Sequence, residues 1–239
     1  MVLNNSIFTD LSTYSPEKSI SFYEKIFGWK YHKNDDYYIA YLNNKIVAGL
    51  YDTPNKFKQM RMPHFWMTYF EVKNVEETVT KAKKSGGIIE ISSTINGLGT
   101  IALIRDPQGA GFTIYEEGRL KNVRTQNTPN TLLWNELHVS NANKVLPFYQ
   151  EIFDWQTIKN EQGVYTIFNH KNQHIIDILE ISNQYKGKYE YWVCTFGVQD
   201  IQETKNKIIE NYGAIIIDEG NRILCTDNSN EAFFYIKEV

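Results

Sequence analysis

Apolar residues recur at helical spacing in two segments of the chain whose sequences nearly coincide. Residues 15–29 read SPEKSISFYEKIFGW, and residues 141–155, which begin 126 positions later, read NANKVLPFYQEIFDW. In the first copy Ile20, Tyr23 and Phe27 fall on one side of a helix. A long repeat of this kind is typical of a chain that builds the same fold twice.

The residues around these two helices predict where each helix begins and ends. Ser15 is expected to accept a hydrogen bond from the first turn, and Gly28 is expected to end the helix. In the second copy Asn141 takes the capping position. Pro147 falls inside that copy and would forfeit a backbone hydrogen bond there, so we expect a bent or late-starting helix.

A strand is predicted before each repeated helix, at residues 7–13 and 133–139. Alternation divides each strand between two faces. Leu11 and Leu137 are expected to lie under the helices. The opposite face would carry Phe8, Asp10 and Ser12 in the first copy and Trp134, Glu136 and His138 in the second. Two hairpins should follow, made of strands 37–42 with 46–51 and strands 164–169 with 174–179.

A second repeated unit follows in each half of the chain. Its first strands, residues 64–72 and 190–198, precede helices 75–85 and 201–211. Asn74 and Asp200 are the predicted caps of these helices, and two or three further strands close each half. We therefore expect four βαβββ modules in two domains, residues 1–117 and 132–239, joined by a polar linker at residues 118–131.

Composition and charge exclude several classes of function. The net charge is −3 and the lysines are dispersed, so no nucleic-acid partner is expected. Cys194 and Cys225 lack the spacing of a zinc site or a disulfide framework. No apolar stretch is long enough to span a membrane, and the first residues lack the features of a signal peptide. The prediction is a cytoplasmic protein without a membrane partner.

Three stretches carry a resemblance to a known family: FTDLSTYSPEKSISFYEKIFGW, WMTYFEVKNVEETVTKAKKSGG with IRDPQGAGFTIYEE, and LWNELHVSNANKVLPFYQEIFDW. The chain resembles the vicinal oxygen chelate superfamily, which includes glyoxalase I, fosfomycin and bleomycin resistance proteins and extradiol dioxygenases. The resemblance implies an α+β fold of two tandem glyoxalase-like domains. In each domain, two βαβββ modules would form an open, curled mixed sheet with the helices outside.

Metal-dependent members of this family hold a divalent ion inside the curled sheet. The matching positions here are Phe8, Gly49, Met67 and Thr113 in the first half and Trp134, Asp177, Val193 and Phe234 in the second. Only Asp177 among them carries a side chain suited to a metal of this kind. We therefore expect no metal site and no cofactor, with a divalent metal bound by other residues as the alternative.

The candidate catalytic residues are Asp10, Glu136 and His138, because a carboxyl group in an aromatic pocket is tuned for proton transfer. The alternative is that these groups only accept or donate structural hydrogen bonds. The candidate ligand-binding residues are Phe8, Tyr69, Thr113, Tyr115, Trp134, Asp177 and Phe234. Packing of a sheet without a ligand is the alternative for the aromatic residues among them.

Two classes of function follow. The first is a protein that binds or sequesters a small organic molecule in an aromatic cavity. The second is an enzyme: either a metal-free acid–base catalyst that uses Asp10 or Glu136, or a metal-dependent lyase, isomerase or dioxygenase. A monomer with an internal pseudo-dimer and a homodimer are both compatible with the repeat. The pattern leaves open whether modules pair within a half or across the two halves.

Overall fold

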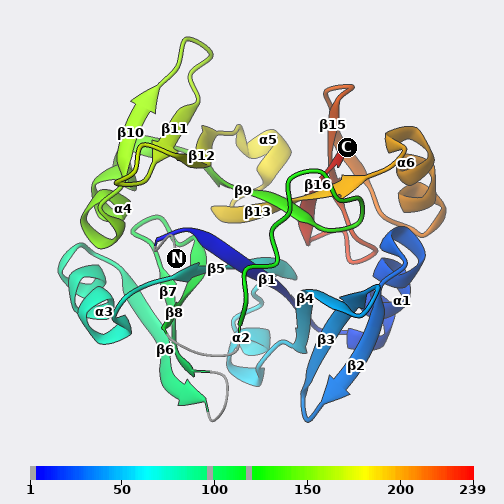
Figure 1. Cartoon of the computed structure of the whole chain (residues 1–239), viewed down its shortest axis with the longest axis horizontal. Helices are drawn as coiled ribbons and strands as arrows, with labels where there is room; N and C mark the ends of the chain where they lie inside the picture. Colours follow the sequence, from blue (N-terminus) through cyan, green and yellow to red (C-terminus); the bar gives the residue numbers. More distant parts are fainter. Residues whose placement is uncertain (1–3, 96–98, 117–119) are drawn as a thin grey trace. The chain divides into compact units, whose positions relative to one another are not determined.

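The computed structural model describes residues 4–95, 99–116 and 120–239 of the chain. The first half begins with β1 (Ser6–Thr13), α1 (Pro16–Phe27), β2 (Lys30–Asn34), β3 (Tyr37–Leu42), β4 (Lys45–Asp52) and the short α2 (Asn55–Gln59). It continues with β5 (Phe65–Glu71), α3 (Val75–Lys84), β6 (Ile88–Ile95), β7 (Gly99–Arg105) and β8 (Gly111–Glu116) (Figure 1).

The second half repeats this order. Its first module contains β9 (Leu132–Val139), the 3-10 turn η1 (Ala142–Lys144), α4 (Leu146–Phe153), β10 (Gln156–Lys159), β11 (Tyr165–Phe168), β12 (His174–Glu180) and the short α5 (Asn183–Lys186). Its second module contains β13 (Tyr191–Val198), α6 (Ile201–Glu210), β14 (Ile215–Asp218), β15 (Arg222–Thr226) and β16 (Phe233–Glu238). The predicted α+β fold of four βαβββ modules is confirmed.

Within the described residues, the strands form two open, eight-stranded mixed sheets. Their orders are β2-β3-β4-β1-β5-β8-β7-β6 and β10-β11-β12-β9-β13-β16-β15-β14. The pairing of β1 with β4 is parallel and sets Asp10 beside Gly49, and the pairing of β9 with β12 sets Glu136 beside Asp177. The strand register around Asp10 in the first sheet is therefore repeated around Glu136 in the second sheet.

The helix boundaries confirm most of the sequence interpretation. Gly28 ends α1 in the left-handed conformation, and the side chains of Asn74 and Asp200 cap α3 and α6. As Pro147 predicted, α4 starts late, after the 3-10 turn, and carries this proline in its first turn. The expectation for Ser15 was wrong: its side chain makes no cap hydrogen bond, and its backbone N–H donates to Thr13 Oγ1 instead (3.2 Å).

Packing divides the chain into two compact units, and each unit combines modules from both halves. Unit 1 comprises the described residues of the ranges 1–7, 68–122 and 135–192. Unit 2 comprises Phe8–Met67, Val123–Trp134 and Val193–Val239. The sheets follow the sequence halves while the units cross them, so the boundaries 1–117, 118–131 and 132–239 stay a prediction. Residues 1–3, 96–98 and 117–119 of these ranges lie outside the described part.

The cores of the two units repeat one aromatic arrangement. In unit 1, Phe70 of β5 packs on Phe153, Trp155 and Trp192, with ring centroids 5.0–5.5 Å apart. In unit 2 the equivalent ring belongs to Phe196 of β13, which packs on three rings in the same way: Phe27, Trp29 and Trp66. A strand from one half therefore buries its ring against the helix and turn from the other half.

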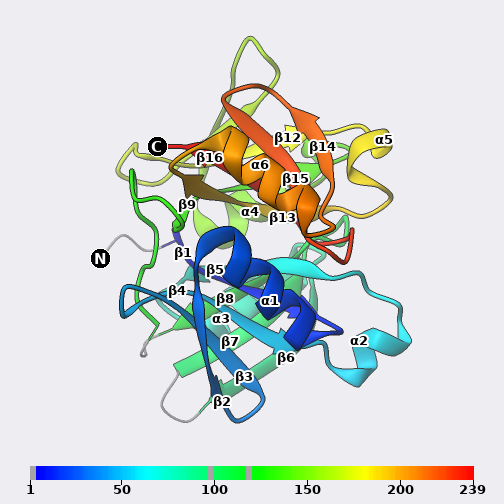
Figure 2. The ribbon, with the colours of Figure 1, turned by 90° about the vertical axis from the view of Figure 1, so that its right-hand side faces the viewer.

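Helices cover one face of the strands in each unit. In unit 1, α3 lies against β6 and β7. In unit 2, α6 lies against β15 and β16 (Figure 2), where Ile201 and Ile208 pack into the core. We call the face of a strand that points away from these helices its inner face. No helix in the described part of the chain is long and apolar enough to cross a membrane.

Candidate functional site

The inner face of β9 carries a buried carboxylate and imidazole. Leu137 and Val139 pack in the core of unit 1, so alternation directs Glu136 and His138 to the inner face. Their side chains are 2% and 0% exposed, and His138 Nε2 lies 2.7 Å from Glu136 Oε1. The sequence predicted both residues and their shared face, and the structure joins them by a hydrogen bond.

Two further residues extend this site within unit 1. Asp177 of β12 is the backbone partner of Glu136, and its neighbours Ile176 and Ile178 belong to the core, so Asp177 shares the inner face. Its Oδ1 atom lies 2.9 Å from Nε2 of His174. The ring of Tyr191, at the start of β13, lies 5.4 Å from the ring of His138. The predicted set of Glu136, His138 and Asp177 is thus brought together on neighbouring strands.

This arrangement is suited to holding and moving a proton. A carboxylate accepts the hydrogen bond of an imidazole N–H, and the pair can carry one additional proton on either partner. Since both side chains are buried, the hydrogen bond lies in a medium of lower dielectric than water, which strengthens it.

The equivalent position in unit 2 is built differently. Asp10 is fully buried and accepts a hydrogen bond from the hydroxyl of Tyr37 (2.8 Å). A Cβ atom at Gly49 would lie 1.9 Å from that hydroxyl, so glycine is what lets Tyr37 reach Asp10. Burial, reinforced by the charge of Asp10, raises the pKa of Tyr51 far above its usual value. Ser12 bonds to Thr53 (2.9 Å). A carboxylate held by a tyrosine thus replaces the carboxylate–imidazole pair.

The predicted ligand-binding residues of β5 and β8 share the inner face of unit 1. Tyr69 and Thr113 are register partners, and the residues that alternate with them and with Tyr115 belong to the core. The Tyr115 hydroxyl accepts a hydrogen bond from the backbone N–H of Leu120 (3.0 Å), and burial raises its pKa. All three side chains are buried, as packing or as walls of a binding surface.

The other two inner-face aromatic residues lie in unit 2. Phe8 is buried on β1. Trp134 lies beneath the guanidinium of Arg124, whose central carbon is 4.7 Å from the ring centroid. Burial lowers the pKa of Arg124 to about 10. Sequence reasoning placed Arg124 in a polar linker, and nothing in that segment's pattern identified it as a partner of Trp134.

Phe234 does not face inward. It packs in the core of unit 2, with its ring 5.8 Å from that of Tyr23 and 6.0 Å from that of Phe27. The preceding turn explains the error: Asp106 N–H donates to the carbonyl of Ala110, whereas Asp227 N–H donates to that of Ala232, which adds one residue to the second copy. One residue reverses the face of every later side chain.

Tyr235 therefore takes the inner position that Phe234 was expected to occupy. The guanidinium of Arg222 stacks on the Tyr235 ring, 4.1 Å from its centroid, and donates a hydrogen bond to its hydroxyl (3.3 Å). A signal for this residue was present in the sequence, because aligning the two turns by Ala110 and Ala232 rather than by Asp106 and Asp227 shifts the match by one position.

Each unit also contains a buried Trp–Tyr–Asp relay, whose members were not among the predicted site residues. In unit 1, Trp192 Nε1 donates to the Tyr149 hydroxyl (3.1 Å), which donates to Asp106 Oδ2 (3.0 Å). Burial raises the pKa of Asp106 to about 6, although three backbone N–H groups and Tyr149 oppose the shift. Unit 2 repeats the relay with Trp66, Tyr23 and Asp227. Its presence in both copies favours a structural role.

The residues at the family's metal positions do not fit a divalent ion. Phe8, Gly49 and Met67 offer no suitable ligand, and the corrected alignment replaces Phe234 by Tyr235. Across residues 4–95, 99–116 and 120–239, no group of three or more His, Cys, Asp or Glu side chains is arranged to hold a metal. A divalent ion would need other ligands, so we derive no chemistry through one.

Comparison with known proteins finds a matching family model for the first half of the chain and relatives that span most of it. Residues 8–114 match the model of the Glyoxalase/Bleomycin resistance protein/Dioxygenase superfamily. The chain is 26% identical over 221 residues to the putative glyoxylase CFP32 of Mycobacterium tuberculosis, covering 88% of this chain and 84% of that protein. It is 24% identical over 226 residues to the anthracycline biosynthesis protein DnrV of Streptomyces peucetius, covering 86% and 81%.

Solved structures share the whole fold at low sequence identity. The Mn(II)-bound glyoxalase of Novosphingobium aromaticivorans superposes with a TM-score of 0.63 at 10% identity, covering 99% of this chain and 82% of the other. Homoprotocatechuate 2,3-dioxygenase of Brevibacterium fuscum superposes with a TM-score of 0.66 at 12% identity, covering 98% and 80%. Residues 8–114 therefore form a domain of the Glyoxalase/Bleomycin resistance protein/Dioxygenase superfamily, and the chain as a whole shares its fold with these solved structures.

Proposed function

We propose that this protein binds a small organic molecule at the inner face of β9, with the Glu136–His138 pair as its ionisable element and without a divalent metal. The observation that carries the proposal is the hydrogen-bonded pair itself, 2.7 Å long and almost fully removed from solvent. Because a carboxylate hydrogen-bonded to an imidazole is an arrangement that general acid–base chemistry uses, the pair is the first place to look for chemistry.

The repeat supports a role beyond folding. The scaffold of the first copy forms with Asp10 and Ser12 at the equivalent positions and joins them to different partners, Tyr37 and Thr53. A carboxylate–imidazole pair is therefore not required to build this sheet. Burying ionisable groups carries a desolvation cost that lowers stability. A role in acting on a ligand would account for retaining such groups in the second copy.

The names of the relatives suggest a ligand class. Two of them are anthracycline biosynthesis proteins from Streptomyces, so flat polycyclic aromatic compounds are the first candidates. The Tyr191 ring beside His138 offers a stacking partner for such a ligand, and the pair offers a hydrogen-bond donor and acceptor. Ring hydroxyl and carbonyl groups would pair with Glu136 and His138.

The same pair supports a second candidate function, metal-free acid–base catalysis. Glu136 could take a proton from a carbon or oxygen of the ligand while the His138 imidazole returns it at another atom, which leaves the composition of an isomerised product unchanged. Asp10 accepts a hydrogen bond from the Tyr37 hydroxyl, which makes it the weaker base candidate.

A thermal-shift screen in EDTA tests the proposed function. A ligand present at one hundred times its dissociation constant adds about 2.7 kcal/mol to the free energy of unfolding, which raises the melting temperature measurably. We expect at least one flat aromatic compound to stabilise the wild type and to stabilise Glu136→Gln less. Asp10→Asn, the matched change in the other copy, should keep the full shift. Stabilisation that appears only when EDTA is omitted and a divalent metal is added would contradict the proposal.

A further inference from the structure

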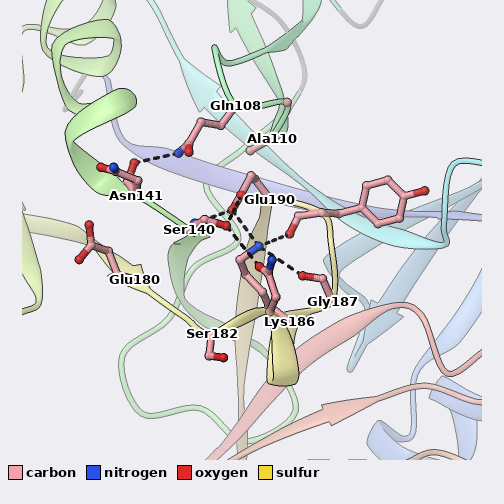
Figure 3. A network of polar contacts seen from close by, with 12 residues as sticks. Gln108, Ala110, Ser140, Asn141, Glu180, Ser182, Lys186, Gly187 and Glu190 are labelled. Carbon is pink, nitrogen blue, oxygen red and sulfur yellow. Dashed lines mark hydrogen bonds and ion pairs between the residues drawn. The ribbon is translucent and has the colours of Figure 1, made fainter.

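A second polar network lies beside the Glu136–His138 pair, and a lysine is at its centre. Lys186, the last residue of α5, has a side chain that is 0% exposed. Its ammonium lies 3.1 Å from Glu190 Oε2 and donates to the backbone carbonyls of Tyr189 (2.9 Å) and Gly187 (3.4 Å). Figure 3 shows these groups converging on the ammonium. The buried ammonium of Lys186 is thus surrounded by three hydrogen-bond acceptors.

Glu190 connects this lysine to the strand that carries His138. Its Oε1 atom accepts a hydrogen bond from Ser140 Oγ (2.6 Å), and its Oε2 atom accepts one from the Ser140 backbone N–H (2.8 Å). Ser140 directly follows β9 and lies two positions after His138 in the chain. The network of Lys186, Glu190 and Ser140, which we call the lysine clamp, therefore fixes the end of β9.

The lysine clamp also fixes the ring that packs on His138. Tyr191 directly follows Glu190, and its ring lies 5.4 Å from the His138 ring at an angle of 50°. Holding Glu190 in place therefore holds the start of β13 and the Tyr191 ring. The Glu190 carboxylate is therefore hydrogen-bonded to the residue that follows β9 and is adjacent in sequence to Tyr191, whose ring packs on His138.

The repeat shows that the fold does not require the lysine clamp. The positions equivalent to Ser140 and Glu190 in the first half are Tyr14 and His64, whose rings contact each other at 4.8 Å. Lys58 of the corresponding short helix pairs with Asp52 at the surface instead. Apolar groups often replace a buried ion pair without loss of stability, so the charged version calls for a reason other than folding.

We infer that Lys186 is a positioning residue for the Glu136–His138 pair and acts through Glu190, Ser140 and Tyr191. This inference rests on the proposed function, because a positioning role requires that the Glu136–His138 pair act on a ligand. It assigns to Lys186 no contact with a ligand. Its effect is to hold the His138 imidazole in the one orientation in which Nε2 meets Glu136.

Nitrogen-15 NMR of the histidine rings tests this inference without any ligand. The chain has five histidines, so the long-range ¹H–¹⁵N spectrum is simple, and a His138→Gln sample assigns the His138 signals. The double variant Lys186→Met with Glu190→Gln removes both charges, which avoids leaving one buried charge unpaired. Lys188→Met, a change at an exposed lysine two positions away, is the matched control.

In the folded double variant, the His138 ring signals should shift or broaden while those of the other histidines stay in place. Modification of His138 by diethyl pyrocarbonate should accelerate about tenfold, which corresponds to about 1.4 kcal/mol of lost local stability. Lys188→Met should match the wild type in both measurements. Unchanged His138 signals and an unchanged modification rate in a folded double variant would overturn the inference.

Two more variants keep the outcome decisive. Ser140→Ala removes one hydrogen bond and no charge, so it is a milder version of the same change and serves if the double variant does not fold. In that case, a folded Ser140→Ala protein with wild-type His138 signals would overturn the inference. Lys186→Arg should restore the wild-type His138 spectrum. If ligand binding proves independent of Glu136 while the His138 signals still respond to the lysine clamp, the proposed function fails and the structural coupling stands.

Discussion

Replacing Asp106 by Asn should change how the stability of the protein depends on pH. Asp106 is buried, and its pKa is raised from 3.8 to about 6. A carboxyl group whose pKa is higher in the folded state binds its proton more tightly there, so its contribution to stability is present below pH 3.8 and is lost as the pH rises to about 6. At about 1.4 kcal/mol per pH unit, the loss is about 3 kcal/mol.

Asn keeps the side-chain oxygen that accepts the three backbone N–H groups but does not titrate. Urea denaturation at pH 4, 5, 6 and 7 and constant ionic strength measures both proteins. The free energy of unfolding of the wild type should fall by about 2 kcal/mol relative to that of the variant between pH 4 and about pH 6, and by only a few tenths of a kcal/mol more up to pH 7. Asp227, whose pKa burial also raises, is common to both proteins and cancels. A pH-independent difference, or one that grows in favour of the wild type with rising pH, would refute the reasoning.

Two further predictions test the placement of side chains on the strands. Gly49→Ala should cost about 1–3 kcal/mol in urea denaturation and release the Tyr37 hydroxyl from Asp10, because the new methyl group would overlap that hydroxyl; full stability would show that the bond is not constrained in this way. Phe234→Ala should cost about 3–5 kcal/mol, whereas Tyr235→Phe, which removes one hydroxyl, should cost about 1 kcal/mol. A loss below about 1 kcal/mol for Phe234→Ala would contradict the corrected face assignment.

Sequence reasoning located the repeated helices closely because their ends are set by local chemistry. The glycine after α1, the asparagine before α3 and the proline in α4 each act within one turn, so their effects can be predicted without tertiary information. Strands β2 (Lys30–Asn34) and β10 (Gln156–Lys159) were absent from the predicted ranges, since they are short, mostly exposed and largely polar and show no apolar alternation.

Local sequence patterns predicted the face of some strand residues in the candidate site correctly and that of others wrongly. Alternation along β9 was enough to pair Glu136 with His138, because both residues lie on one strand. Phe234 required a count across a turn, and a single additional residue reversed its face. The compact units that combine both halves were beyond any local pattern, since amphipathicity shows which face is buried and not which element covers it.

The most direct test of the central claim is an isothermal titration of the wild type and Glu136→Gln with the strongest ligand of the thermal-shift screen. Each titration is run in EDTA and again with added Mn²⁺ or Fe²⁺. Losing a hydrogen bond to a charged group costs about 1.5–3 kcal/mol, so the dissociation constant should rise about 10- to 100-fold in Glu136→Gln and should not respond to metal in the wild type. Binding that disappears in EDTA and returns with the metal, or that is unaffected by Glu136→Gln, would contradict the assignment of the site to the Glu136–His138 pair.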